Sequence, residues 1–191
     1  MKQKQKSKKT IKKKFFEVSA PLTSTPIHLY ASSEEELAGR TVKIDLTRNL
    51  RGKSIEMLLR IFLEDGKLVG NPETLLLSQS YIKRLMRGGV DYCEDSFETE
   101  CRDSTAKIKP FLITRKRVPR SILKALRNET KNFISGYAKT RTAKEIMTEI
   151  ITNKFQKQLS LKLKKIYPLA LCEIRVFEIL EQKKNVSNSS A

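Results

Sequence analysis

The segment KIKPFLITRKRVPRSILKALR, residues Lys107–Arg127, changes character along its length and decides the fold. In its first half, Ile108, Leu112 and Thr114 alternate with Lys109 and Ile113 around Phe111, as in a strand. Pro110, which has no backbone N–H to donate, indicates a sheet edge or a bulge. We therefore predict an edge strand there. Its second half predicts an amphipathic helix, with Pro119 at the first helical position, where the missing donor costs nothing. The segment joins a sheet half to a helical half.

The predicted helix has one basic face. At about 100° per residue, four cations form one stripe, and a set of apolar residues gathers roughly a third of a turn away. The stripe is Arg120, Lys124, Arg127 and Lys131, and the apolar set is Ile122, Leu123, Leu126, Phe133, Ile134 and Tyr137. Together with Arg115, Lys116 and Arg117, the stripe is predicted to meet phosphate while the apolar face docks on protein. For an isolated helix, a merely solvated basic face is the alternative.

Composition bounds the class of protein. The chain has 191 residues, 39% of them hydrophobic with eight Phe, which is enough for a core. Its 39 Lys and Arg against 21 Asp and Glu give a net charge of +18, so an acidic polymer or an anionic surface is the expected partner, nucleic acid first. No apolar run approaches the roughly 20 residues of a membrane span, and no secretory signal follows the basic start. We expect a soluble, unexported protein with no membrane partner.

Catalytic and metal-binding patterns are weak. Cys93, Cys101 and Cys172 fit neither a disulfide framework nor a paired CxxC site, so reduced cytosolic thiols are expected. His28 is the sole histidine, which excludes a histidine pair or a zinc cluster. We predict no enzyme activity, no cofactor and no metal.

Two sequence features are compatible with enzyme activity. Gly52-Lys53-Ser54 resembles the end of a phosphate-binding loop, but Thr47 occupies the position of its first glycine. A group of acids could bind a hard cation as in a nuclease, although an ordinary solvated face is favoured. These acids are Asp91, Glu94, Asp95, Glu98, Glu100 and Asp103.

Periodicity predicts an α+β fold, with a curved or barrel-like, mostly antiparallel sheet packed with helices from the C-terminal half. Residues 1–14 are expected to form a basic, disordered arm, residues 15–182 a single RNA-binding domain, and residues 183–191 a polar tail. The predicted strands are Phe15–Pro21, Pro26–Tyr30, Arg40–Leu46, Met57–Leu63 with a short return at Leu68 and Val69, and Ala170–Leu180. The predicted helices are Pro72–Arg87, Pro119 onward, and one or two that begin at a Thr142/Glu145 capping box and stop by Pro168.

Between these elements, Val90–Cys101 is predicted as a strand or hairpin with a strongly acidic side that faces away from RNA.

Positive charge gathers in three places: the arm, the Arg115–Lys131 segment and Lys154–Lys165. Such segregation is typical of a polyanion-binding surface. There is no RNP-type aromatic pattern, C2H2 spacing or helix-turn-helix, and the absence of Trp leaves little sign of a base-stacking platform, so recognition of backbone shape is expected. The predicted RNA-binding residues are Lys8, Lys9, Lys12, Lys13, Lys14, Arg115, Lys116, Arg117, Arg120, Lys124, Arg127 and Lys131.

Four stretches carry a family resemblance. They are FFEVSAP from Phe15, GRTVKIDL from Gly39, FLITRKR from Phe111 and KIYPLALCEIRVFEIL from Lys165. In this order they resemble the small-subunit ribosomal proteins of the S-three-a or S-one-e family of archaeal and eukaryotic ribosomes, over about Lys14 to Leu180. Phe15-Phe16 stands where that family often has an aromatic pair with Trp.

The resemblance implies a structural protein on the platform of the small subunit near the messenger exit. The implied partners are small-subunit ribosomal RNA and neighbouring ribosomal proteins, with messenger RNA near the exit and initiation factors in addition. It implies a cytoplasmic, ribosomal location, and a nucleolar one during assembly in a eukaryote. A transient ribosome-assembly or translation factor, and a small metal-dependent RNA-processing enzyme that uses the acids above, are the alternatives.

Overall fold

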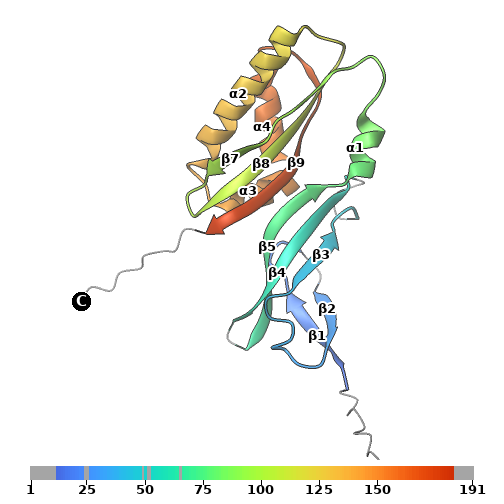
Figure 1. The fold of residues 1–191 in the computed structure, drawn as a ribbon, viewed down its shortest axis with the longest axis vertical. Coiled ribbons are helices and arrows are strands. Elements are labelled where there is room, and N and C mark those ends of the chain that lie inside the picture. The colour runs from blue at the N-terminus through green and yellow to red at the C-terminus, as the bar shows by residue number, and fades with distance from the viewer. Residues whose placement is uncertain (1–11, 24–25, 49, 51–52, 65, 183–191) are drawn as a thin grey trace, which may run out of the picture. The chain divides into compact units, whose positions relative to one another are not determined.

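The computed structural model describes residues 12–23, 26–48, 50, 53–64 and 66–182 (Figure 1). The chain divides into two compact units, one built from Met1–Val42 and Leu59–Asn71 and the other from Lys43–Leu58 and Pro72–Ala191. Most of the predicted arm and the predicted polar tail lie outside the described residues. A single domain over residues 15–182 stays a prediction.

The described residues form nine strands and four helices. The strands are β1 (Lys14–Ser19), β2 (Ile27–Ala31), β3 (Thr41–Asp45), β4 (Ile55–Glu64), β5 (Lys67–Leu77), β6 (Tyr92–Glu94), β7 (Phe97–Glu100), β8 (Ser104–Thr114) and β9 (Leu169–Gln182). The helices are α1 (Gln79–Leu85), α2 (Arg120–Ala138), α3 (Ala143–Ile151) and α4 (Lys154–Leu163).

The strand pairing confirms the α+β class but not a barrel. The hydrogen-bonded order is β2-β1-β5-β9-β8-β6, with β3 on β4, β4 also on β5, and β7 on β8. β1 runs parallel to β5, so the sheet is mixed, and its described strands do not close on themselves. The prediction of a barrel-like sheet was wrong because the terminal strands β2 and β6 do not pair with each other.

The first unit has its own small core. β1 and β2 pair antiparallel, and alternate residues of each strand point inward, as their periodicity predicted. The buried cluster consists of Val18, Ala31, Leu37, Ile61 and Leu68, against which Phe16, Ile27, Leu29 and Val42 pack. The predicted strands that begin at Phe15, Pro26 and Arg40 are confirmed.

The helix predicted from Pro72 to Arg87 was wrong in its first half. Residues up to Leu77 continue β5, and only Gln79–Leu85 is helical, with the Ser78 hydroxyl accepting a hydrogen bond from the Tyr81 N–H as its cap. Asn71-Pro72 has the residue types of a helix N-terminus. The short apolar run that follows fits the period of a strand as well as that of a helix. Pairing of Thr74–Leu76 with β9, about a hundred residues later in the chain, stabilises the strand.

In the second unit, β8 and β9 form a long antiparallel pair. β8 also pairs with β6 and β7 on its other side, so the prediction of an edge strand was wrong. Pro110 is tolerated in this interior strand because the register shifts between Lys109 and Pro110. The bulge that Pro110 also indicated is therefore present.

The segment Val90–Cys101, predicted as a strand or hairpin, forms the two short strands β6 and β7 and not a hairpin. β6 and β7 each pair with β8 rather than with each other. The predicted strand near Ala170 is confirmed as β9, which starts one residue earlier, at Leu169.

Three helices cover this part of the sheet (Figure 1). α2 packs on β6 and β7, while α3 and α4 pack on β9. The buried side chains of the three helices include Leu126, Ile134, Ile146, Met147, Phe155 and Leu159. Pro119 is the N-cap of α2 and not its first helical residue, and Asn153, with a φ of 60°, separates α3 from α4.

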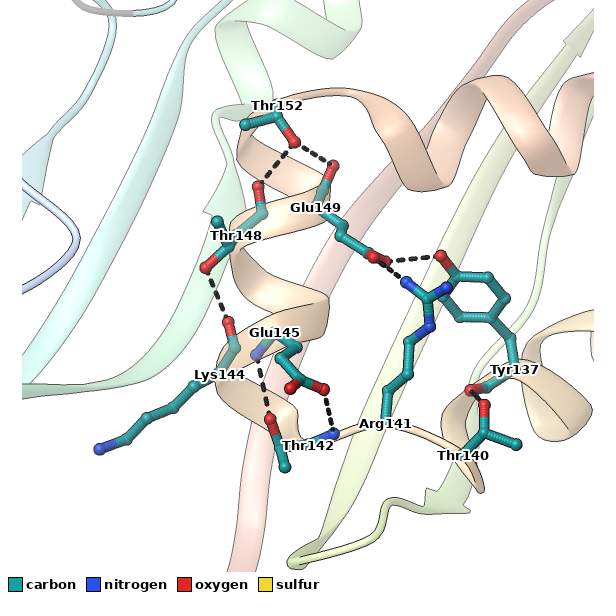
Figure 2. Close-up of polar contacts among 9 residues, drawn as sticks. All are labelled: Tyr137, Thr140, Arg141, Thr142, Lys144, Glu145, Thr148, Glu149 and Thr152. Atoms are coloured by element: carbon teal, nitrogen blue, oxygen red, sulfur yellow. Dashed lines mark hydrogen bonds and ion pairs between the residues drawn. The ribbon is translucent and has the colours of Figure 1, made fainter.

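The predicted capping box at the start of α3 is confirmed (Figure 2). The Thr142 hydroxyl accepts a hydrogen bond from the Glu145 N–H at 3.3 Å, and the Glu145 carboxylate accepts one from the Thr142 N–H at 3.0 Å. Within the same helix, the Thr148 hydroxyl donates a hydrogen bond to the Lys144 carbonyl at 2.9 Å. This bond does not cap an end of the helix.

Thr142→Ala should lower the free energy of unfolding by about 1 kcal/mol, because the Glu145 N–H loses its acceptor. Thr148→Ala is the matched control in the same helix and should change stability by no more than a few tenths of a kcal/mol, since alanine is the better helix former. Urea unfolding followed by circular dichroism measures both. Equal losses in the two variants would contradict the capping role.

Candidate nucleic-acid interface

The loop between β8 and α2 is held by two residues at its base. The Thr114 hydroxyl lies 2.8 Å from both the Asp91 and the Lys116 carbonyl oxygens, and it accepts a bond from the Asp91 N–H at 3.1 Å. The Asp91 carboxylate accepts a hydrogen bond from the Val118 N–H at 2.8 Å. Because Thr114 is fully buried, both ends of the loop are anchored in the fold.

This anchored loop presents cations to solvent. Arg115, Lys116 and Arg117 are exposed, and the exposed residues of α2 continue the positive charge. We call the set Arg115, Lys116, Arg117, Arg120, Lys124, Arg127 and Lys131 the basic loop–helix surface. The structure brings all seven predicted residues of this segment onto one continuous loop and helix.

The opposite face of α2 fixes the helix in place. Leu126, Ile134 and Ala138 are buried, and the Thr130 hydroxyl donates a hydrogen bond to the Leu126 carbonyl at 2.7 Å inside the core. Burial of each large apolar side chain stabilises the docked helix by roughly 1.5–3 kcal/mol. The cations therefore project from a rigid support.

Arg127 touches the fold at one further point. Its guanidinium lies beside the thiol of Cys93, on β6. Burial raises the pKa of the Cys93 thiol, and the positive charge of Arg127 opposes that rise. The thiol stays protonated at neutral pH, so it places no negative charge beside the Arg127 guanidinium.

Among the described residues, the basic loop–helix surface has no acidic partner. None of its seven cations forms an ion pair within the part of the chain that the structure describes. Other cations do pair with glutamates: Arg40 with Glu36, Lys43 with Glu56, Lys53 with Glu173, Arg141 with Glu149, Lys162 with Glu129 and Arg175 with Glu94. Positive charge is thus neutralised where it supports the fold and left available along the loop and α2.

The C-terminal end of α2 shows such a structural use of charge (Figure 2). Glu149 binds Arg141 and accepts a hydrogen bond from the Tyr137 hydroxyl at 2.6 Å. The Arg141 guanidinium also lies 4.1 Å from the centroid of the Tyr137 ring. This network ties α2 to α3 and leaves Arg141 committed to the fold.

The predicted lysine arm belongs to the other compact unit. Lys12, Lys13 and Lys14 are exposed, and Lys14 is the first residue of β1 rather than part of a free arm. Lys8 and Lys9 lie outside the described residues. The third basic cluster, on and after α4, is exposed throughout: Lys154, Lys157, Lys162, Lys164 and Lys165.

Several of the candidate metal-binding acids have structural partners instead. Asp91 anchors the loop, Glu94 pairs with Arg175, and the Asp103 carboxylate accepts a hydrogen bond from the Ala143 N–H at 2.9 Å. Among the residues that the structure describes, no three or more His, Cys, Asp or Glu side chains gather as metal ligands.

Lys53 of the phosphate-loop resemblance is also a structural residue. Its side chain is 7% exposed, and its ammonium lies 2.5 Å from the Glu173 carboxylate and 2.7 Å from the Asn153 side-chain oxygen. Glu173 is itself buried, as the partner of Lys53. A lysine held in this way is withdrawn from solvent and from nucleotide phosphates.

The cysteines and His28 are the remaining candidates for chemistry. Burial raises the pKa of the Cys172 thiol to about 12, so the thiol is protonated at neutral pH. None of the three cysteines, all described, is in a disulfide. His28 is exposed on β2.

No described helix is both long and apolar enough for a membrane crossing.

Reasoning from the sequence missed the residues that hold the interface. Asp91 was grouped with an acidic surface, and Thr114 with the strand. Their pairing depends on β6 and β8 lying side by side, with Asp91 directly before β6. No local signal could have revealed it.

The sequence of this chain is similar to those of known proteins. The sequence matches the Ribosomal S3Ae family over residues 1–183. The chain belongs to this family.

Relatives of this S3Ae-family chain include archaeal small ribosomal subunit proteins eS1. The protein of Nanoarchaeum equitans is 26% identical over 183 residues, covering 92% of each chain. That of Desulfurococcus amylolyticus is 26% identical and covers 88% of this chain and 83% of its own. That of Methanothrix thermoacetophila is 25% identical, and the match covers 94% of this chain and 89% of its own. The resemblance expected from the four sequence stretches is confirmed.

Asp91→Ala should speed hydrogen exchange at the Val118 amide by about tenfold to a hundredfold, because that N–H loses a charged acceptor worth about 1.5–3 kcal/mol. Asp95→Ala removes the same charge but only the acceptor of the neighbouring Ser96 N–H, so it should leave Val118 unchanged. Hydrogen exchange at the Val118 amide, measured by mass spectrometry or NMR in both variants, tests this prediction. An unchanged Val118 amide in Asp91→Ala would show that the loop is held by other contacts.

Proposed function

We propose that this S3Ae-family protein is a structural component of the small ribosomal subunit that binds ribosomal RNA through the basic loop–helix surface. The observation that carries the proposal is the absence of acidic partners for its seven exposed cations within the described structure. An acidic polymer supplies the missing negative charge. Family membership supports the RNA of the small subunit as that polymer.

The chemistry of this surface suits phosphate contact more than base reading. Lysine and arginine side chains release condensed counterions when they neutralise phosphates, and this release gives affinity without sequence choice. Arginine also presents a planar fork that matches two phosphate oxygens. A helix anchored on a sheet offers these groups at fixed spacing, so the shape of the RNA backbone is what the surface selects.

The family resemblance supports a further proposal on location and wider role. We infer a place on the platform near the messenger exit, in contact with neighbouring ribosomal proteins, and a contribution to translation in the cytoplasm. Contacts with messenger RNA and initiation factors, and passage through the nucleolus in a eukaryote, belong to the same inference. The exposed lysines Lys12, Lys13 and Lys14 add phosphate contacts from the other unit, as would Lys8 and Lys9. No catalytic step is part of the proposal.

Replacing Arg115, Lys116 and Arg117 together with glutamine should flatten the plot of log affinity against log salt concentration by roughly two to three units, since each phosphate contact contributes about 0.9. Binding of the full chain to a small-subunit RNA fragment over a salt series measures this slope.

A matched control removes three other exposed cations, Lys83, Arg84 and Arg87, on or just after α1. Its slope should stay close to that of the unmodified chain. Equal flattening in both triple variants would show that net charge alone matters, and a salt-insensitive complex would overturn the proposal.

Small subunits washed in high salt should retain the protein in a one-to-one ratio, because a permanent component is held by many simultaneous contacts. Sedimentation followed by quantitative mass spectrometry measures the ratio. Recovery only in precursor particles would instead identify a transient assembly factor.

A further inference from the structure

The outer face of the β1–β2 pair carries two exposed aromatic rings. Phe16 and Val18 of β1 point into the core of the first unit, as do Leu29 and Ala31 of β2, so the alternate residues face solvent. Phe15 and Tyr30 are direct partners in the register of the two strands. Their ring centroids lie 5.0 Å apart at an interplanar angle of 47°.

Both rings are exposed to solvent over more than half of their residue surface. Phe15 is 73% exposed and Tyr30 55%, and no other large hydrophobic residue in the described structure exceeds the exposure of Phe15. A cross-strand aromatic pair stabilises a hairpin, but that contribution arises where the rings touch and does not need their outer faces to remain in water. The uncovered ring surface is available to a flat apolar ligand.

Positive charge lies close to the Tyr30 ring. The Lys13 ammonium lies 5.8 Å from the centroid of the Tyr30 ring, and the flanking Lys12 and Lys14 are exposed. One acid, Glu17, lies on the same face opposite His28. Flat aromatic surface beside cations fits a ligand that is itself flat and anionic.

We propose that Phe15 and Tyr30 form a stacking platform for an unpaired base of RNA, with Lys12 and Lys13 on the adjoining phosphates. Each base has an apolar face that stacks on an aromatic ring, and the lysines bind the backbone on either side. The proposal rests on the proposed function only in taking RNA as the ligand. Its residues lie in the other compact unit from the basic loop–helix surface.

This site differs from the sequence expectation that the chain has little sign of a base-stacking platform. The expectation relied on the absence of Trp and of an RNP-type pattern. The platform arises instead from two residues that are 15 positions apart and meet only through strand register.

The chain contains no Trp, so Phe15→Trp introduces a single fluorescent reporter on the platform. Titration of the full-length variant with a short single-stranded oligouridylate, whose bases are unstacked, should quench this fluorescence. The same sequence held in a duplex should quench it far less, because its bases are not available to stack. Phe62→Trp, at an exposed position of β4, is the matched control and should not respond.

Removing the second ring tests the pair. Tyr30→Ala in the Phe15→Trp background should weaken oligouridylate binding about 5-fold to 150-fold. Tyr30→Leu keeps an apolar side chain of similar reach but has no flat ring, and it should weaken binding similarly. Unfolding curves of both variants establish that the hairpin remains folded.

Retention of labelled RNA measured in the same samples separates this inference from the proposed function. If RNA binds and Phe15→Trp is not quenched, the platform is overturned while the proposed function stands. If Phe62→Trp is quenched equally, or if only a protein partner shields Phe15, the platform is likewise overturned. If the chain binds a small-subunit RNA fragment but not oligouridylate, the platform is overturned while the proposed function stands. If it binds neither RNA, both proposals fail.

Discussion

The antiparallel pairing of β8 with β9 is the constraint on which the larger unit depends. It joins the middle of the chain to its last described strand, and its register must shift at Pro110, because proline has no N–H for the ladder. With that bulge in place, β8 can also pair with β6 and β7, and the resulting surface receives α2. The loop that carries Arg115–Arg117 leaves the end of this same strand, so the position of the basic surface follows from the pairing.

A second constraint is electrostatic. A chain with a net charge of +18 must keep its cations from repelling one another within a small volume. The fold does so by pairing selected cations with glutamate at structural junctions, of which Lys53 with Glu173 and Arg141 with Glu149 are the most enclosed. Within the described structure, the cations on the loop and α2 are left without an acidic partner, and they are the ones that we propose meet an external polyanion. Residues of the same chemical type therefore differ in whether an acid of the fold pairs with them.

Local patterns predicted those parts of the structure that depend on neighbouring residues in sequence. Alternation located β1 to β3, the Thr142/Glu145 spacing located the start of α3, and helical periodicity separated the basic from the apolar face of α2. Errors arose where a distant partner decides. Residues Pro72–Leu77 satisfy both helix and strand patterns, and pairing with β9 selects the strand. The same limit applies to Glu173, whose burial depends on Lys53.

By itself, the sequence determined the excess of positive charge, its clustering on the strand-to-helix segment and the family to which the chain belongs, since all three are written in composition and local order. Only the tertiary structure decided that β8 is an interior strand, that Asp91 and Thr114 anchor the basic loop, and that Phe15 meets Tyr30 on an exposed face. The physical reason is that hydrogen-bond register and burial are properties of pairs of segments. A residue's own neighbours in sequence carry no record of which distant strand will lie beside it.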